Sequence, residues 1–434
     1  RTEERRLSDA FVAGEAIVLF KQNATSGLRT QAQALGSTRG RESESEERNA
    51  LLNLTALTQT AAYSTLASVG ASGFPGGLQT TDSVLQAKLK TLYQLKTLNL
   101  NSDVATAAPN YIRHTQFVPN DPLYQFQWNY PQISLPQAWD LTTGTNAIVA
   151  VVDTGVALGH PDLQGQLTDG YDFISDPINA GDGDGIDNNP DDPGDHSNPD
   201  GSSSFHGTHV SGTVAAATNN GVGVAGVAFD AKVMPLRVCG QYGCTDYDIE
   251  QAIRFAAQLA NDSGTVPTQR ADVVNISLGG PSSSTASQAV YDQVRAAGVV
   301  IVAAASNEAS STPSYPAAYP GVIGVSAVDI NKNLAPYSNY GSWVSVAAPG
   351  GSTASDVNGD GKPDGILSTV ATDSNSTLAY DYVVWQGTSM ATPHVAGIVA
   401  LMKSIAPNLT PTDIASLLSN GALTEDIGDS GKDD

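Results

Sequence analysis

The sequence has no apolar run close to the roughly 18 residues that a helix needs to cross a bilayer, so it predicts no membrane-spanning segment. Cysteine is almost absent, with two residues, and basic residues are few, with 21 Lys and Arg against 44 Asp and Glu. The formal net charge of −23 repels nucleic acid and anionic lipid surfaces, so we expect neither as a partner. Apolar residues make up 40% of the 434 residues, which is enough to bury a large core, and the length predicts two or three domains.

The two cysteines, Cys239 and Cys244, stand in the stretch VCGQYGC. Because no other cysteine or histidine lies nearby, this pair is a poor zinc site and is typical of a small disulfide loop. Such a loop stabilises a fold by about 2 kcal/mol and forms in oxidising compartments. The sequence begins with Arg1, and we expect that a secretory signal preceded it and was removed. Both features predict a secreted, extracellular protein.

A turn from an extended stretch into an apolar helix is predicted around Ser389, in the segment GTSMATPHVAG at 387–397. The start of a helix presents free backbone N–H groups and a partial positive charge. A serine hydroxyl there can cap the helix. It can also act as a nucleophile whose oxyanion meets those N–H groups, if the chain supplies a base and an orienting acid elsewhere.

Two other stretches hold an acid and a base. The segment IVAVVDTG predicts a fully buried strand that ends abruptly at Asp153, where a carboxylate can cap a turn or do chemistry. The segment FHGTHVSGTVAA predicts a loop with His206 that runs into a helix of small residues with His209. A zinc site on one helix needs two histidines four positions apart with a glutamate between them, and this segment has neither feature. Metal binding is therefore the weaker interpretation, and we expect one of the two histidines to be packed.

The segments DTG, HGTH and GTSMA around these residues resemble the three signatures of the subtilisin-like serine proteases, in that family's order. The resemblance implies that Ser389 is the nucleophile, His206 the general base and then acid, and Asp153 the group that orients the imidazole. It also implies that Asn307, which ends the apolar run VVIVAAASN, supplies the oxyanion-hole side chain. Ser306 stands where that family usually has glycine.

The alternation of strand-like and helix-like segments from residue 117 onward predicts an α/β fold. We expect a doubly wound, mostly parallel sheet with helices on both faces, as in the family that the motifs resemble. The expected strands are at 233–238, 273–278, 299–305, 322–328 and 344–347, and the expected helices are at 249–261 and 286–297. Sheets of this kind place their sites at the carboxyl ends of strands, which is where Asp153 and Asn307 are expected.

Residues 1–116 differ in character and predict a small α+β domain. Its expected elements are strands near 14–21 and 104–112 and helices over 51–62 and 85–92, where leucines recur at helical spacing. Placed before a subtilisin-like body, this domain resembles the family's propeptide, an intramolecular chaperone that inhibits the protease with its C-terminal tail. We expect maturation to cut between His114 and Pro119. Residues 117–434 would then form the catalytic domain, which we expect to be truncated at its C-terminus.

The resemblance also implies a peptide-binding segment, formed by Ser277, Leu278, Gly279 and Gly280. Its glycines let a substrate backbone lie alongside as an added strand. The implied walls of the pocket for the P1 residue are Ala303, Ala304 and Ala305, and Ser314 is our candidate for its floor. Small uncharged residues at these places predict an apolar P1 side chain and a broad specificity.

Calcium is the predicted cofactor, at three sites. The segment DVNGDGKPD resembles the first part of an EF-hand loop, with oxygen ligands from Asp356, Asn358, Asp360 and Asp364, although Leu367 stands where the usual glutamate would be. A plain solvated turn is the alternative. In the segment 182–192 the candidate ligands are Asp182, Asp184 and Asp187, because these charges need a cation unless the loop is disordered. A third site, implied by the resemblance alone, would use Asp121, Asp162 and Asn220.

These features together predict a monomeric, calcium-dependent endopeptidase, made as a self-processing zymogen, that acts on protein or peptide substrates through an acyl-enzyme. Two alternatives come from other classes of protein. An inactive relative that serves as a binding module would be expected to have lost a triad residue, and none is lost. A calcium-dependent adhesin does not account for three catalytic motifs in order. Hydrolysis of non-peptide acyl substrates is chemically feasible, but the glycine-flanked edge at 277–280 favours peptides.

Overall fold

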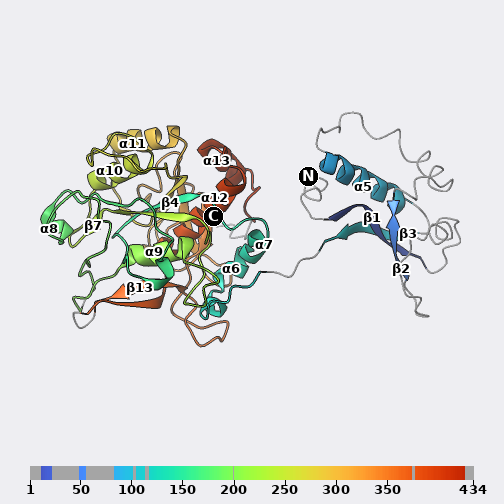
Figure 1. Cartoon of the computed structure of the whole chain (residues 1–434), viewed down its shortest axis with the longest axis horizontal. Coiled ribbons are helices and arrows are strands. Elements are labelled where there is room, and N and C mark those ends of the chain that lie inside the picture. Colours follow the sequence, from blue (N-terminus) through green and yellow to red (C-terminus); the bar gives the residue numbers. More distant parts are fainter. Residues whose placement is uncertain are drawn as a thin grey trace. The chain divides into compact units, whose positions relative to one another are not determined.

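The computed structural model describes residues 11–21, 48–54, 83–100, 104–112, 117–198, 200–373 and 377–425. The chain divides into two compact units, residues 1–115 and residues 116–434 (Figure 1). The first unit has one sheet and one helix among its described residues, and the second holds every predicted site residue.

The first unit is a three-stranded antiparallel sheet with a helix packed on it. β1 (Phe11–Phe20) lies between β2 (Arg48–Asn53) and β3 (Val104–Tyr111), and α5 (Ser83–Asn99) covers the sheet. The predicted helix over 51–62 is wrong at its start, because residues 48–53 form β2, where Leu52 is fully buried in the core with Leu98 of α5. Residues 55–62 lie outside the described residues.

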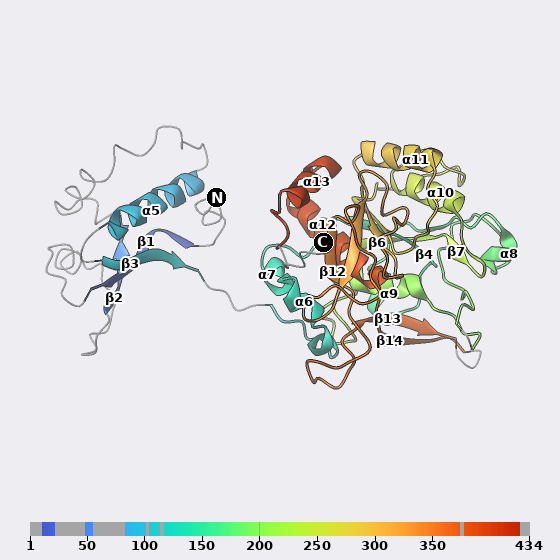
Figure 2. The same cartoon turned by 180° about the vertical axis from the view of Figure 1, so that it is seen from behind.

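The second unit is built on a seven-stranded parallel sheet. In pairing order its strands are β12 (Val346–Pro349), β11 (Ile323–Val328), β10 (Val300–Ala304), β9 (Val273–Ile276), β4 (Ile148–Asp153), β6 (Lys232–Arg237) and β5 (Tyr171–Asp172). The helices that cover one face are α9 (His206–Ala215) and α12 (Thr388–Ile405), and those that cover the other are α10 (Asp246–Ala256) and α11 (Thr285–Ala296) (Figures 1 and 2). The predicted doubly wound α/β fold is confirmed.

Strand β4 shows why this sheet forms. All six residues of IVAVVD are buried, and successive side chains of a strand point to opposite faces. Val149 and Val151 enter the core under α9 and α12, and the apolar residues between and before them enter the core under α10 and α11. The one polar residue of the strand, Asp153, stands at its carboxyl end, where sheets of this kind hold their sites.

The remaining elements are short or lie outside this sheet. They are η1 (Tyr124–Phe126), α6 (Asn129–Gln132), α7 (Leu135–Trp139), η2 (Pro161–Leu163), α8 (Pro177–Ala180), β7 (Cys239–Gly240), β8 (Gly243–Cys244), β13 (Ile366–Thr372), β14 (Ala379–Trp385) and α13 (Pro411–Ser419). β13 and β14 pair antiparallel, as do β7 and β8, which the predicted disulfide between Cys239 and Cys244 joins. In the described ranges no helix combines the length and the apolar character that a membrane span requires.

Arg237, the last residue of β6, is a buried cation with 1% of its side chain exposed. Its guanidinium donates hydrogen bonds to the carboxylates of Asp172 and Asp182 and to the carbonyl of Ala180. A buried charge is tolerated only when it is paired and hydrogen-bonded. This cluster therefore fastens the segment that follows β5 to the strand that lies beside Asp153 in the sheet.

We expect replacement of Arg237 by methionine to lower the free energy of unfolding by about 3–5 kcal/mol, because it leaves the buried carboxylate of Asp172 without its cation. Arg254→Met, on the partly exposed side of α10, is the matched control and should change stability by less than about 0.5 kcal/mol. Urea denaturation followed by circular dichroism measures both. Equal losses in the two variants would show that the buried cluster does not stabilise the fold.

Candidate active site

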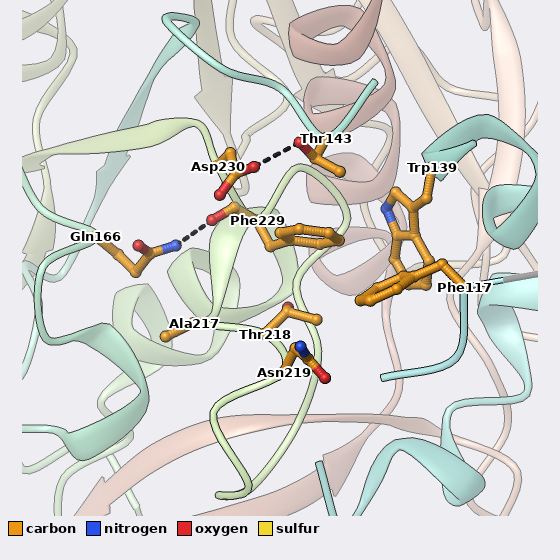
Figure 3. A pocket seen from close by; sticks show the side chains of 9 residues that line it. All are labelled: Phe117, Trp139, Thr143, Gln166, Ala217, Thr218, Asn219, Phe229 and Asp230. Atoms are coloured by element: carbon orange, nitrogen blue, oxygen red, sulfur yellow. Dashed lines mark hydrogen bonds between the residues drawn. The ribbon is translucent and has the colours of Figure 1, made fainter. Parts of the chain in front are cut away.

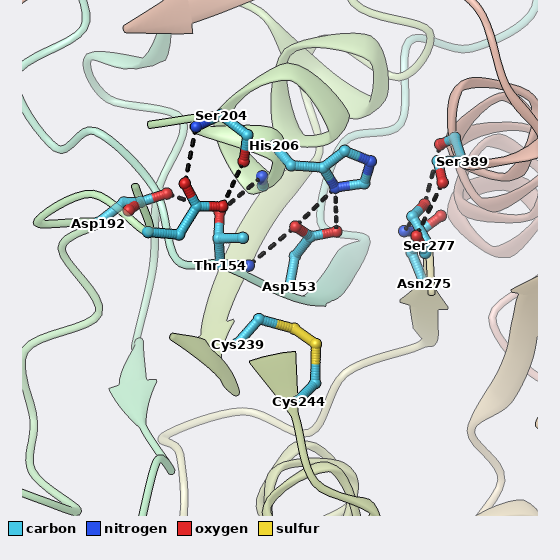
Figure 4. A network of polar contacts seen from close by, with 12 residues as sticks. Asp153, Thr154, Asp192, Ser204, His206, Cys239, Cys244, Asn275, Ser277 and Ser389 are labelled. Carbon is cyan, nitrogen blue, oxygen red and sulfur yellow. Dashed lines mark hydrogen bonds and ion pairs between the residues drawn. A yellow bond between two sulfur atoms is a disulfide. The ribbon is translucent and has the colours of Figure 1, made fainter. Parts of the chain in front are cut away.

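Asp153 and His206 make a direct contact where β4 ends and α9 begins. The Nδ1 atom of His206 lies 2.8 Å from Oδ1 and 3.0 Å from Oδ2 of Asp153. A carboxylate only accepts hydrogen bonds, so Nδ1 carries the proton and Nε2 is left as an acceptor. The Asp153 side chain is 2% exposed and that of His206 is 25% exposed. Figure 4 shows the imidazole on the side of Asp153 that faces Ser389.

The electrostatics of this pair act on the pKa of His206. Burial alone lowers the pKa of His206, but the Asp153 carboxylate, with smaller contributions from Asp195 and Asp192, raises it above its usual 6.5. The backbone N–H of Thr154 donates to Asp153 Oδ1 at 2.8 Å, which helps to fix the orientation of the carboxylate. The arrangement is a base oriented by an acid.

Helix α9 approaches β4 so closely that only glycine fits at position 207. A Cβ on Gly207 would lie 2.2 Å from the carbonyl oxygen of Gly155 and 3.0 Å from Cβ of Asp153. The glycine of the HGTH segment therefore sets the separation between the helix that carries His206 and the strand that carries Asp153.

Ser389 stands in the first turn of α12, after Gly387, whose φ of +153° suits glycine. Its hydroxyl donates to the carbonyl of Ser277 at 2.9 Å, and the hydroxyl of Ser277 donates to the carbonyl of Ser389 at 2.9 Å. This reciprocal pair ties α12 to the segment after β9. Ser389 and His206 are both described, and no hydrogen bond joins them in this conformation of the serine.

Asn307 follows β10, and its amide is oriented by Thr388. The N–H and the hydroxyl of Thr388 donate to Asn307 Oδ1 at 2.9 and 3.1 Å, so Nδ2 remains available as a donor. Ser306, before it, has a left-handed φ of +79°, the conformation for which glycine is the usual residue, and its N–H donates to Thr388 Oγ1 at 3.1 Å. The departure from the family's glycine therefore leaves this backbone conformation in place.

The predicted peptide-binding segment follows β9 and reaches the surface. Gly279 is exposed and Leu278 and Gly280 are half-buried, whereas Ser277 is 3% exposed. Gly280 and Tyr315 exchange two backbone hydrogen bonds of 2.8 and 2.7 Å, which hold the segment against the chain around 315. The segment therefore has a fixed conformation with an accessible glycine.

The residues predicted to surround the P1 side chain divide into two kinds. The alanines at 303–305 are at most 2% exposed, so their side chains line no open surface in this structure. Ser314 does lie next to the peptide-binding segment, because a Cβ on Gly279 would stand 2.9 Å from its Oγ. The hydroxyls of Ser314 and Ser306 are 2.8 Å apart, which places two polar groups behind Gly279.

Asp121, Asp162 and Asn220 are brought together. Asn220 Nδ2 donates to Asp162 Oδ1 at 2.9 Å and its backbone N–H donates to Asp121 Oδ1 at 3.1 Å. Asp121 is 4% exposed and Asp162 is fully buried, and within the described ranges neither forms an ion pair with Lys or Arg. Burial raises the pKa of Asp162, against the hydrogen bond from Asn220. Two buried carboxylates without a protein cation fit a bound cation.

The loop at 356–364 folds around its own acidic side chains. Asp356 accepts N–H groups of the three residues at 359–361, and Asn358 Nδ2 donates to Asp360 Oδ2 at 2.9 Å. Asp364 is 2% exposed, and its Oδ1 atom is buried without a hydrogen-bond partner. In the described residues Asp356, Asp360 and Asp364 are not gathered into a group that could hold a metal, but the buried Asp364 oxygen without a donor fits a cation ligand.

The predicted calcium set of Asp182, Asp184 and Asp187 is not assembled. Asp182 is bonded to Arg237, Asp184 is exposed, and Asp187 accepts the N–H of Asn189 at 2.7 Å. For the residues that the structure describes, no group of three or more His, Cys, Asp or Glu side chains is placed to hold a metal. Arg237 supplies the positive charge here, an alternative to calcium or disorder that the sequence analysis did not include.

The comparisons with known proteins agree with this geometry. Residues 144–433 match the family model described as the Subtilase family. The chain belongs to the subtilase family of serine proteases. It is 40% identical over 352 residues to an "Extracellular protease" of Xanthomonas campestris and 39% identical over 362 residues to an "Extracellular basic protease" of Dichelobacter nodosus. These alignments cover 78% and 77% of this chain but 58% of each relative, so the chain spans little more than half of their length.

Two further relatives are matched over most of their length. "Thermitase" of Thermoactinomyces vulgaris is 36% identical over 290 residues, which are 66% of this chain and 86% of that protein. A solved structure of a protease from Pseudoalteromonas arctica has 43% sequence identity and a TM-score of 0.65, and the match covers 70% of this chain and 92% of that one. The subtilase fold of the second unit is therefore supported by sequence and by structure.

Sequence reasoning missed Trp385, which stacks on both histidines of the HGTH segment. Its ring centroid lies 4.7 Å from that of His209 and 6.3 Å from that of His206, with nearly parallel planes. His209 is fully buried, and burial lowers its pKa to about 3, so it is the packed, neutral histidine that was predicted. A tryptophan in an extended segment gave no signal of this contact, and neither did Asp192, which accepts the hydroxyl of Thr154.

A pocket of about 410 Å³ lies elsewhere in this subtilase, and no predicted site residue lines it (Figure 3). Its lining residues are Phe117, Trp139, Thr143, Gln166, Ala217, Thr218, Asn219, Phe229 and Asp230. Asp230 is bonded to the Thr143 hydroxyl, and Gln166 to the Phe229 carbonyl, so its main polar side chains already have partners. The pocket is separate from the Asp153–His206 pair.

We expect Gly207→Ala to lower the free energy of unfolding by about 3 kcal/mol, because the new Cβ cannot fit between α9 and β4. It should also reduce kcat/KM on a chromogenic peptide by at least about tenfold, since His206 and Asp153 are pushed apart. Gly280→Ala is the stability control, because a Cβ at Gly280 meets nothing within 4 Å. A Gly207→Ala enzyme as stable as the parent would contradict the packing argument.

Proposed function

We propose that this subtilase is a secreted serine endopeptidase that uses Ser389, His206 and Asp153 and is made as a self-processing zymogen. The observation that carries the proposal is the contact of His206 with Asp153, which leaves Nε2 free, together with Ser389 in the first turn of α12. A base oriented by an acid, a hydroxyl nucleophile and an oxyanion donor are the parts that acyl transfer needs.

The reaction begins with a rotation of the Ser389 side chain away from the Ser277 carbonyl and toward Nε2 of His206. Ser389 Oγ then attacks the scissile carbonyl while Nε2 takes its proton, and Asp153 stabilises the imidazolium through Nδ1–H. His206 returns the proton to the leaving amine as the C–N bond breaks, which leaves an acyl-enzyme. Water, deprotonated by the same nitrogen, releases the acid and restores the serine.

The negative oxygen of each tetrahedral intermediate is stabilised by two donors. One is the N–H of Ser389, which lies in the first turn of α12 and has no acceptor within the helix. The other is Nδ2 of Asn307, which the contact of Thr388 with Oδ1 leaves free. Donors fixed in place before the reaction stabilise developing charge without reorganisation.

The substrates are proteins or peptides that bind as an added strand along residues 277–280. The exposed Gly279 leaves room for a backbone to approach, and the antiparallel bridge between Gly280 and Tyr315 holds the segment still. We propose a broad specificity with an apolar P1 residue. The hydroxyls of Ser306 and Ser314 behind Gly279 restrict the depth that such a side chain can use.

Residues 1–116 are proposed to act as the propeptide, a folding aid and inhibitor that the protease removes from residues 117–434. The sheet and helix of the first unit are consistent with a folded module of this kind.

Secretion is supported by the disulfide and by two relatives whose names include "extracellular". We expect the mature enzyme to be monomeric, and neither nucleic acid nor a membrane is proposed as a partner.

Calcium is proposed as a structural cofactor at two sites. One would use the buried carboxylates of Asp121 and Asp162 with Asn220, and the other the loop with Asp356, Asn358, Asp360 and Asp364. When bound, the ion would neutralise carboxylates that no basic side chain pairs with. It takes no part in the acyl transfer.

The proposed function is tested by expressing the chain beside its Ser389→Ala and Ser283→Ala variants, with and without calcium. Intact mass should show a fragment ending between His114 and Pro119 released from the parent and from Ser283→Ala only. Peptide hydrolysis by Ser389→Ala should fall by more than about 10⁴-fold. Release of the same fragment by all three proteins, or hydrolysis that Ser389→Ala retains, would reject the triad and favour the binding-module alternative.

Calcium should raise the thermal midpoint of the inactive Ser389→Ala protein relative to the same protein in chelator. At a hundredfold excess of calcium over Kd, each site should add about 2.7 kcal/mol to the free energy of unfolding. Adding Asp364→Ala should remove part of this gain, and adding Asp162→Ala should remove another part. Asp140→Ala, on the exposed surface, is the control and should keep the full gain. Equal midpoints in calcium and chelator would rule out both sites.

A further inference from the structure

The loop whose described residues are 190–198 and 200–205 is packed against the segment directly after Asp153 (Figure 4). The N–H of Val156 donates to the carbonyl of Pro190, and the N–H of Asp192 donates to the carbonyl of Val156, both at 3.1 Å. A Cβ on Gly155 would lie 2.7 Å from the Pro190 carbonyl oxygen, so the contact leaves no free space. The loop ends at Phe205, the residue before His206, and thus joins the surroundings of both members of the pair.

Three carboxylates hold this loop, and each accepts a hydrogen bond from a hydroxyl. The pairs are Thr154 with Asp192, Ser204 with Asp195 and Ser203 with Asp373, each at 2.6 Å. Within the described part of the chain none of the three carboxylates forms an ion pair with Lys or Arg. The loop is therefore held by directional hydrogen bonds, and the Thr154 pair differs from the others because Thr154 adjoins Asp153.

The Thr154 side chain connects the strand end to the helix start. Its hydroxyl donates to Asp192 Oδ2 and accepts the backbone N–H of Gly207 at 3.0 Å, while its own N–H donates to Asp153. A hydroxyl has one proton, so a Thr154 hydroxyl that donates to Asp192 keeps an oxygen lone pair for the N–H of Gly207. Without this acceptor the hydroxyl is free to rotate and α9 loses a fixed contact at its first turn.

We propose that Asp192 is a positioning residue for the catalytic pair, which acts through the Thr154 hydroxyl to fix the start of α9, and so His206, relative to Asp153. The proposal rests on the proposed function, in which this pair activates Ser389. Asp192 is 4% exposed, and its carboxylate accepts the Thr154 hydroxyl and the N–H of Gly194 at 2.9 Å; among the described residues no hydrogen bond joins it to Ser389 or to the segment at 277–280. Its carboxylate therefore contacts the surroundings of the catalytic pair through Thr154 and does not hydrogen-bond to the peptide-binding segment.

The charge of Asp192 gives this role a signature that a merely structural contact lacks. The charged groups that act on it are Asp195 and Arg237, and its own charge, with that of Asp195, helps to raise the pKa of His206. Burial raises the pKa of Asp192 to about 7, against hydrogen bonds from Thr154 and Gly194. A neutral residue at 192 removes a nearby negative charge and therefore lowers the pKa of His206. Because catalysis needs neutral His206, the acidic limb of kcat/KM then moves toward lower pH.

The experiment compares Asp192→Asn, Asp192→Ala, Thr154→Val and the Asp192→Ala/Thr154→Val double variant with the parent. Asp200→Asn is the matched control, because it makes the same charge change at a fully exposed position of the same loop. Each enzyme is matured in calcium, its active sites are counted with an irreversible serine-directed inhibitor, and kcat and KM are measured on a chromogenic peptide across pH. Thermal midpoints of the same samples report folding.

We expect Asp192→Ala and Thr154→Val each to lower kcat by about tenfold with KM unchanged within about twofold, because only the positions of catalytic groups change. The double variant should be no worse than either single variant, since both remove one connection. Asp192→Asn keeps an acceptor and should lose less than about threefold in kcat, with its acidic limb shifted down by roughly 0.3 pH unit. Asp200→Asn should match the parent.

The proposal is overturned if Asp192→Ala, counted per active site, keeps the parent's kcat and pH profile while only its thermal midpoint falls, since the contact is then structural. Fully additive losses in the double variant would also overturn it, because Thr154 would not carry the effect. An inactive parent rejects the proposed function itself, a result that differs from either of these.

Discussion

The hydrogen bond between Asp153 and His206 is the constraint on which the rest of this site depends. It joins the end of a central strand to the start of a helix 53 residues later. β4 is buried on both faces and ends at Asp153, so this carboxylate lies where the carboxyl ends of the parallel strands meet. Helix α9 comes close to it because Gly207 has no side chain. Val210 and Val214 then anchor the helix in the core. The geometry of this pair is therefore a product of core packing, and polar contacts such as that of Thr154 adjust it.

Much of this site could be predicted because each part is local in the sequence. The run IVAVVDTG contains both a buried strand and its end, and GTSMA lies where an extended segment becomes a helix. The order of the motifs then identified the family and, with it, the fold. Local pattern fails in the first unit, where leucine spacing fits a helix but residues 48–53 form β2. Leu52 packs with Leu98, a partner that no short window of sequence contains.

The partners of the charged groups could not be predicted, because they are set by tertiary contacts. With 44 acidic and 21 basic residues, the chain cannot pair every carboxylate with a protein cation. Asp182 meets Arg237, 55 residues later; Asp192 relies on a hydroxyl and a backbone N–H; and Asp364 keeps a buried oxygen without a donor. An aspartate looks the same in the sequence whether its carboxylate is paired with arginine, accepts hydrogen bonds or keeps an oxygen without a donor. Composition therefore predicts that cations are scarce, but not which carboxylate lacks one.

Thr388 shows how the proposed nucleophile, Ser389, and the proposed oxyanion donor, Asn307, are kept in register. Its N–H and hydroxyl hold the oxygen of Asn307, and its hydroxyl oxygen also accepts the N–H of Ser306. A left-handed φ costs a residue with a Cβ about 1–2 kcal/mol, which explains why glycine is usual at position 306. The bond to Thr388 and the contact with the Ser314 hydroxyl offset this strain. Serine is tolerated at position 306 because the bond to Thr388 holds the backbone there in its left-handed conformation. The placement of Asn307 relative to Ser389 therefore does not depend on a glycine at position 306.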